Sequence, residues 1–207
     1  MPIKHFALIM LFSVFALAAP PEPIDAGKTT GNVFESSYFH FRYELPKGWF
    51  ALDDSVRLAE NKKRFDDEMK EAIEKHGPDS ATQENEVIVP FSLVVAGRTA
   101  VAAGGTKQLP RVVVQASKRR IMMSEAGDPA KLMIQIGHPK VLKDPEETVI
   151  SGHKFVSADF QFRPGSLLSK FATVSGDYII EFELRAENEK DLADLVNTMQ
   201  TLKFSDH

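Results

Sequence analysis

The sequence predicts an α+β fold in which a central antiparallel β-sheet is flanked by α-helices on both faces. Residues 38–45 alternate between apolar and polar side chains, as a half-buried strand does. Three further strand-like segments follow one another near the C-terminus and are joined by short turns. A long charged helix after the first strand and an apolar-striped helix at the C-terminus supply the covering layers.

The N-terminal residues are predicted to be a cleaved secretory signal peptide. Lys4 precedes an apolar run over 6–16, which is far shorter than the roughly 20 residues that span a bilayer. Ala16-Leu17-Ala18 has the A-x-A form of a cleavage site, so we expect cleavage after Ala18. We therefore assign 1–18 as signal peptide, 19–31 as a flexible leader and 32–207 as a single domain. This predicts an exported protein, periplasmic or extracellular, with no transmembrane segment in the mature chain.

The amino-acid composition excludes several kinds of chemistry and of binding partner. The 207 residues include 25 basic and 29 acidic side chains and no cysteine. Without cysteine there is no disulfide framework, no thiolate nucleophile and no lipid-modified cysteine. A mildly acidic chain without a basic stripe is not expected to bind nucleic acid.

The first strand lies in the segment YFHFRYELPKGW, residues 38–49. Phe39, Phe41, Tyr43 and Leu45 fall on one face, which we expect to be buried. The turn residues 46–48 end the strand, and Trp49 is expected to cover the end of the sheet. A short edge strand is expected over 32–37.

Residues 53–76 carry the longest helical pattern. Asp53 or Asp54 can cap the start, and Gly77-Pro78 stops the helix. The spacing predicts an apolar face, which would cover the sheet, made of Leu58, Phe65, Met69, Ala72 and Ile73. Acid-first ion pairs four residues apart are expected on the remaining surface, namely Glu60–Arg64, Asp66–Lys70 and Glu71–Lys75.

The middle of the chain predicts two strands, over 87–99 and 111–117, separated by a loop containing Gly104-Gly105. This glycine pair lacks the context of a phosphate-binding loop and is interpreted as a turn. A short helix is expected over 128–136, with Asp128 as its N-cap and with Leu132, Met133 and Ile136 on its apolar face. Residues 121–123 fit either a strand or a helix.

The C-terminal part has the clearest pattern. Strands are expected over 154–162, 168–175 and 178–186, with hairpin turns between them. An amphipathic helix follows over 189–202, capped by Asn188. Its apolar stripe consists of Leu192, Leu195, Val196, Met199 and Leu202.

Two segments together resemble the PsbP-like family, named after an extrinsic subunit of the photosynthetic oxygen-evolving complex. They are F-x-F-x-Y-x-L-P-K-G-W at 39–49 and the strands, helix and Leu202-Lys203-Phe204 of the C-terminal part. The resemblance covers 39–49 and roughly 152–204, while the middle of the chain matches weakly. It implies a central antiparallel sheet with helices on both faces and a binding or assembly role, and it carries over no catalytic residues. The chain departs from lipoprotein relatives in having no cysteine to carry a lipid.

Candidate chemical groups are scattered through the sequence. No histidine pair has the spacing of a zinc helix, so we expect no metal and no cofactor. His138 and His153 would need to converge with Asp144 or Glu146 to form a site, and isolated solvated histidines are the alternative. Asp159 and Glu181 are candidates for an acid–base pair on neighbouring strands; the alternative is an exposed sheet face on which Lys170 neutralises one of them. Met69, Met122, Met123 and Met133 are interpreted as core residues rather than metal ligands.

The leading hypothesis is an exported, non-enzymatic domain that binds a protein partner or a cell-envelope component. A periplasmic small-molecule or metal carrier, with a pocket between the sheet and a helix, is the alternative. An unrecognised hydrolase is the third hypothesis. The candidate partner-binding residues are Asp66, Asp67 and Glu71 on the long helix, which carries eight acids and six bases over 53–76. A solvated covering helix is the simpler interpretation of that surface. The sequence does not specify the oligomeric state.

Overall fold

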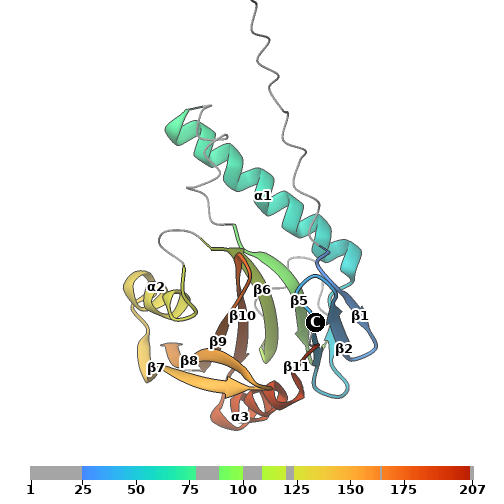
Figure 1. Cartoon of the computed structure of the whole chain (residues 1–207). Helices are drawn as coiled ribbons and strands as arrows, with labels where there is room; N and C mark the ends of the chain where they lie inside the picture. Colours follow the sequence, from blue (N-terminus) through green and yellow to red (C-terminus); the bar gives the residue numbers. More distant parts are fainter. Residues whose placement is uncertain (1–24, 78–88, 100–108, 120–123, 164, 206–207) are drawn as a thin grey trace, which may run out of the picture.

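The structure is a computed structural model that describes residues 25–77, 89–99, 109–119, 124–163 and 165–205 (Figure 1). Within these ranges the chain forms two antiparallel sheets and three α-helices, so the predicted α+β class is confirmed. The expected signal peptide, the Gly104-Gly105 turn and residues 121–123 lie outside the described residues.

The larger sheet has seven strands. In spatial order they are β4 (Phe50–Ala51), β5 (Phe91–Gly97), β6 (Arg111–Lys118), β10 (Tyr178–Ala186), β9 (Ser166–Ser175), β8 (His153–Arg163) and β7 (Lys140–Ile150). The three predicted C-terminal strands are confirmed as β8, β9 and β10, each paired antiparallel with the next. Strands β5 and β6 correspond to the two strands predicted in the middle of the chain.

The outermost strand of this sheet, β7, was not predicted. Its sequence KVLKDPEETVI contains Pro145 and a run of charges, and most of its side chains are exposed. The pairing with β8 also shifts register between Val141 and Lys143 and between Lys143 and Glu146. Charged residues, proline and irregular pairing are typical of edge strands. The charged residues and proline also break the apolar–polar alternation by which a strand is recognised in a sequence.

The smaller sheet has the order β1 (Lys28–Thr30), β2 (Val33–Ser36), β3 (Phe41–Glu44) and β11 (Lys203–Phe204). Strand β2 confirms the strand expected over 32–37, although it is an inner strand and not an edge. The flexible leader expected over 19–31 is wrong for its last residues. Ala26 is buried, and β1 pairs with β2 along its whole length, so this part of the chain is held by the sheet.

Strand β3 is shorter than the alternation predicts. The chain turns at residues 37–40, and His40 has a φ of 54°. All four predicted inward side chains are nevertheless buried, and Trp49 packs against the same core. The Tyr43 hydroxyl donates to Thr198 Oγ1 at 2.5 Å, and burial raises the pKa of Tyr43 to about 12.

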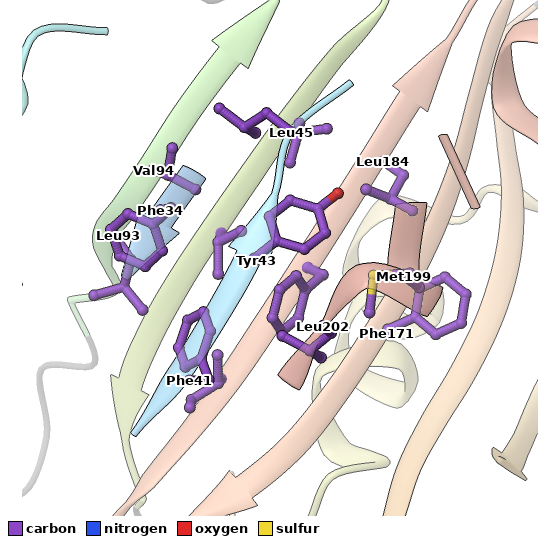
Figure 2. Close-up of a cluster of buried hydrophobic side chains, with 14 of the residues drawn as sticks. Phe34, Phe41, Tyr43, Leu45, Leu93, Val94, Phe171, Leu184, Met199 and Leu202 are labelled. Carbon is purple, nitrogen blue, oxygen red and sulfur yellow. The ribbon is translucent and has the colours of Figure 1, made fainter. Parts of the chain in front are cut away.

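The main hydrophobic core lies between the two sheets (Figure 2). Phe34, Phe41, Tyr43 and Leu45 of the smaller sheet meet Leu93, Val94, Phe171 and Leu184 of the larger one. Met199 and Leu202 close the core at the C-terminus. Each such side chain contributes roughly 1.5–3 kcal/mol when it leaves water. The predicted apolar stripe of the C-terminal helix is thereby confirmed.

The two short helices cover opposite faces of the larger sheet. Helix α3 (Glu189–Thr198) begins at the predicted cap, where the Asn188 side chain accepts from the Asp191 amide, and it continues as a 3₁₀ turn over Met199–Thr201. It packs in the same cluster as Phe171, whereas helix α2 (Asp128–Gly137) contacts Ala172, the next residue on β9. Consecutive strand residues point to opposite faces, so the predicted arrangement of helices on both faces holds for α2 and α3.

Two details of α2 differ from the prediction. The N-cap is Gly127, and the Asp128 carboxylate accepts from the backbone amides of Ser124 and Glu125 instead. Ile136 is 73% exposed, so it does not belong to the buried face. Leu132 and Met133 pack against the sheet as expected, and Ala130 and Ile134 join them in place of Ile136.

Candidate partner-binding surface

Helix α1 spans Asp54–His76, and its bounds follow the sequence signals closely. The Asp53 carboxylate accepts from the Ser55 hydroxyl and from the Ser55 amide, the latter at 2.9 Å, and these bonds lower the pKa of Asp53. Gly77 ends the helix with a φ of 86°. Figure 1 shows α1 starting beside β1 and running past the sheets at its C-terminal end. It lies along the part of β5 around Ser92 that extends beyond the pairing of β5 with β4.

The contact between α1 and β5 is polar. Asn61 donates from Nδ2 to the Ser92 carbonyl oxygen at 2.8 Å and accepts from the Ser92 amide with Oδ1 at 2.9 Å. Arg64 donates to the carbonyl oxygen of Pro90 at 3.0 Å and to Ser92 Oγ at 3.2 Å. Asn61 therefore satisfies the backbone N–H and C=O groups that a neighbouring strand would otherwise pair. This prevents another chain from pairing with β5 at Ser92, as happens when exposed sheet edges aggregate.

Arg57 anchors the first turns of α1. Its side chain is 1% exposed. The guanidinium donates to the carbonyl oxygens of Ala26, Gly27 and Ser92 at 3.3, 3.0 and 3.1 Å, and to Asp54 Oδ1 at 2.9 Å. This single side chain joins the helix to both sheets, because Gly27 precedes β1 while Ser92 lies in β5. A planar guanidinium with five donors suits such a junction.

The apolar stripe of α1 consequently faces outward. Leu58 is 50% exposed, Phe65 is 52% exposed and Ile73 is 38% exposed, with Met69 partly buried between them. These four residues are called the outer stripe below. The prediction that they cover the sheet is wrong; of the predicted face only Ala72 is buried. The reason is that the edge of β5 offers backbone donors and acceptors, which polar side chains satisfy and apolar ones do not.

The charges on α1 pair differently from the prediction. Glu71 and Lys75 form the expected ion pair, which lowers the pKa of Glu71 and raises that of Lys75. Asp66 pairs instead with Lys62 at 2.7 Å, and Lys70 with Glu74 at 3.9 Å. Arg64 turns to the body of the protein. All these pairs are exposed, so solvent screens them and they add little to the stability of the fold.

The three candidate residues Asp66, Asp67 and Glu71 are all exposed, but they do not form one patch. Consecutive helix residues are roughly 100° apart about the axis, so Asp66 and Asp67 face different directions. Asp67 and Glu71, four residues apart, share one side of the helix. Asp66 lies next to the outer stripe, one residue after Phe65, and is the member of the trio that borders it.

A cavity of about 650 Å³ lies between the N-terminus of α2 and strands β7, β8 and β9. Its charged lining residues are Arg119, Lys131, Lys154, Glu125, Glu146 and Glu147. Several of these already have partners in the protein. Arg119 donates to the carbonyl oxygens of Ser124 and Gly176, and Lys131 pairs with Asp128 at 3.2 Å. The lining carries three basic and three acidic side chains, so its formal charges balance.

The proposed acid–base pair of Asp159 and Glu181 does not form. These residues lie on β8 and β10, with β9 between them, and Asp159 accepts a hydrogen bond from Ser169. Glu181 instead contacts Lys170 Nζ at 2.5 Å, and Glu183 contacts it at 3.3 Å. The expected neutralisation by Lys170 is thus present, but on a buried surface: Lys170 and Glu181 are 5% and 3% exposed.

The histidines lie in separate surroundings. His138 is an exposed helix-capping residue with a φ of 42°. The His153 ring contacts Phe204 with centroids 3.8 Å apart and the two planes tilted by 31°. Across the ranges that the structure describes, no group of three or more histidine, aspartate or glutamate residues has the arrangement of a metal site. None of the described helices is long and apolar enough to cross a membrane.

Sequence reasoning missed Arg57, Asn61 and Arg64, the residues that fix α1. Their spacing of four and three residues defines a face as clearly as the apolar stripe does. Polar helix residues were interpreted as a solvated surface, so this signal was not used.

No protein-family model and no curated protein sequence matches the chain. Among solved structures, it is similar to the solution structure of cyanobacterial PsbP (CyanoP) from Synechocystis sp. PCC 6803. The TM-score is 0.45 at 10% sequence identity, over 86% of this chain and 96% of that chain. Membership of the PsbP-like family stays a prediction.

Proposed function

We propose that this chain is an exported, non-enzymatic domain that binds a protein partner through the outer surface of α1. The observation that carries the proposal is the outward orientation of the outer stripe, with Leu58 and Phe65 each about half exposed. A helix on a soluble domain normally turns its apolar face to the core. Grouped apolar side chains left in water are typical of binding surfaces.

The non-enzymatic part is supported by the state of the candidate acids. Asp159 is held by Ser169, and Glu181 is held in an ion pair with a buried lysine. A general acid or base needs a free proton-transfer position that faces a substrate. Both carboxylates are instead used in the packing of the larger sheet.

Export rests on residues 1–18 of the sequence. Intact-mass analysis of the protein recovered from the exporting cell tests it. We expect a chain that begins at Ala19, and recovery of the full-length chain would contradict export with cleavage.

The binding surface is tested by capture from envelope extract with purified protein as bait. Phe65→Glu places a charge in the middle of the outer stripe, and we expect loss of the captured protein. The matched control is Phe50→Glu, because Phe50 is 53% exposed but lies on β4. Circular dichroism checks that both variants fold. A captured protein that is unaffected by Phe65→Glu, in a folded variant, contradicts the proposal.

The charged residues are tested separately. Reversal of Asp66, Asp67 and Glu71 to lysine is expected to weaken capture at low salt, where rim charges affect association most. Reversal of Asp144, Glu146 and Glu147 on β7 makes the same change in charge elsewhere on the surface. If both triple variants capture the same amount of protein, the three acids of α1 have no role in binding. The outer stripe alone would then be the binding surface.

The carrier alternative is supported by the cavity of about 650 Å³ between α2 and the sheet. Its balanced positive and negative lining fits a zwitterionic small molecule better than a simple ion. Thermal-shift measurements with amino acids and dipeptides test it, with Lys154→Glu as the variant, since Lys154 lines the cavity from β8. A stabilisation lost in that variant supports a carrier, and the absence of any stabilisation removes this alternative.

A further inference from the structure

We propose that the cavity between α2 and strands β7, β8 and β9 binds a free α-amino acid with an apolar side chain. This inference rests on the carrier alternative, which it makes specific, and it is independent of the outer stripe. The cavity has a volume of about 650 Å³. That volume falls within the range of small-molecule sites, so the charges and the apolar surface of the lining decide which molecule fits.

Two oppositely charged side chains of the lining lack an ion-pair partner. Glu147 on β7 and Lys154 on β8 both line the cavity, and neither forms a salt bridge within the described part of the chain. An unpaired carboxylate and an unpaired ammonium can bind the two ends of a zwitterion through charge-assisted hydrogen bonds. A lone cation would be repelled by Lys154, and a lone anion would be repelled by Glu147.

Other charges at the cavity are offset by their neighbours. Glu146 pairs with Lys143 at 2.6 Å. Arg119 donates to the carbonyl oxygen of Ser124 at 2.8 Å, and the acid Glu125 is the next residue in the chain. Glu147 and Lys154 are therefore the pair most open to a ligand.

The spacing of Glu147 and Lys154 suits a small zwitterion. In the antiparallel pairing of β7 with β8, Glu147 lies opposite Val156 and Lys154 lies opposite Val149, so the two charged residues are diagonal neighbours on one face. Diagonal Cα atoms are about 7–8 Å apart, within reach of long side chains. An α-amino acid carries its ammonium and its carboxylate on one carbon atom, so it fits between the two side chains. In a dipeptide the same groups are a peptide unit further apart.

The same face supplies an apolar surface. The Val156 side chain faces α2, because a Cβ on Gly127 would lie 3.9 Å from Val156 Cγ1. Lys154 lies two residues before Val156 in β8, so both side chains share this face. Val174 lines the cavity from β9 and is 40% exposed. An apolar ligand side chain would remove this surface from water, which glycine would not do.

Isothermal titration of the full chain with four probes tests the ligand class. The probes are leucine, leucinamide without the carboxylate, N-acetylleucine without the ammonium, and glycine without the apolar side chain. We expect leucine to bind, and each of the other three to bind at least about fivefold more weakly.

Two variants test which residue holds which end of the ligand. Glu147→Gln should weaken leucine and leucinamide by about fivefold but not N-acetylleucine. Lys154→Met should weaken leucine and N-acetylleucine but not leucinamide. Glu146→Gln is the matched control, because Glu146 lines the same cavity but pairs with Lys143, and it should retain binding. Circular dichroism checks that all three variants fold.

Each contrary outcome has a distinct meaning. Equal binding of leucine and leucinamide overturns the zwitterion. Leucyl-leucine that binds more tightly than leucine shows a peptide site, which overturns the amino acid and keeps the carrier alternative. Leucine binding that is unchanged in both folded variants shows a different site and overturns the inference. Failure of every amino acid and dipeptide removes the carrier alternative as well. The proposal for α1 is tested separately, by capture with Phe65→Glu.

Discussion

Asn61 on α1 and Ser92 on β5 form a reciprocal pair of hydrogen bonds, in which the Asn61 side-chain amide serves both the N–H and the C=O of Ser92. A side chain here takes the place of a neighbouring strand. Together with Arg57 and Arg64, which donate to carbonyl oxygens of the body, this contact fixes the rotation of α1, and in that rotation Leu58 and Phe65 are about half exposed.

Replacing Asn61 by leucine should destabilise the fold by about 2 kcal/mol, because a part-buried amide and carbonyl lose a partner. Urea denaturation measures the loss, and hydrogen exchange should show faster exchange of the Ser92 amide. Lys63→Leu, an exposed position on the same helix, is the control and should change stability by less than about 0.5 kcal/mol. A Ser92 amide that stays protected in Asn61→Leu would contradict the edge-capping role.

Lys170→Met should lower the free energy of unfolding by about 3–5 kcal/mol, because it leaves Glu181 and Glu183 buried without their shared cation. Chemical denaturation compares this variant with Lys131→Met, which removes the cation of an exposed pair with Asp128. The control should cost less than about 1 kcal/mol. Similar losses in the two variants would show that the Lys170 cluster is not buried in solution.

Glu183 should make stability depend on pH in the acid range. Lys170 and Arg185 keep its carboxylate charged against the effect of burial, so the pKa of Glu183 is lowered from 4.5 in the folded protein. The stabilisation is fully present above pH 4.5 and is lost as the pH falls through the lowered pKa. Chemical denaturation at a series of pH values measures the free energy of unfolding. Glu183→Gln should be less stable than the wild type at neutral pH, and the difference between the two proteins should shrink as the pH falls. A difference that does not change with pH would contradict this assignment.

Gly27→Ala should strongly destabilise the N-terminal strand. Gly27 has a φ of 79°, and a Cβ there would lie 2.4 Å from Phe34 Cζ and 2.6 Å from the Glu35 carbonyl oxygen. Gly31→Ala is the matched control, since its φ of 63° is similar but no atom lies within 4 Å. Thermal unfolding should separate the two variants, and equal midpoints would show that residues 26–30 are not packed as described.

The sequence predicts most of the fold because its signals are local. Strands β8 to β10 alternate regularly and are joined by turns. The bounds of α1 follow from its caps, Asp53 and Gly77, because caps act within one helical turn. The missed strand β7 shows the limit of such signals. Its position depends on pairing with β8, while its own residues include proline and many charges.

The candidate site was predicted less well, for a related reason. The helix was correctly located and its outer charges were identified, but its rotation depends on the unpaired edge of β5, which is distant in sequence. Lys170 likewise gives no local sign of burial, since a lysine in an alternating strand is typical of an exposed face. In both cases the surroundings of the side chain are set by residues that are distant in the sequence.

Cysteine labelling tests the orientation of α1 most directly, because the natural chain has no cysteine to interfere. Single variants Phe65→Cys and Asn61→Cys are exposed to a thiol reagent in the native state and in urea. The orientation described here predicts that Phe65→Cys reacts almost as fast in the folded protein as in the unfolded one. Asn61→Cys should react at least about tenfold more slowly when folded. A protected residue 65 beside a reactive residue 61 would place the outer stripe against the sheet and contradict the account.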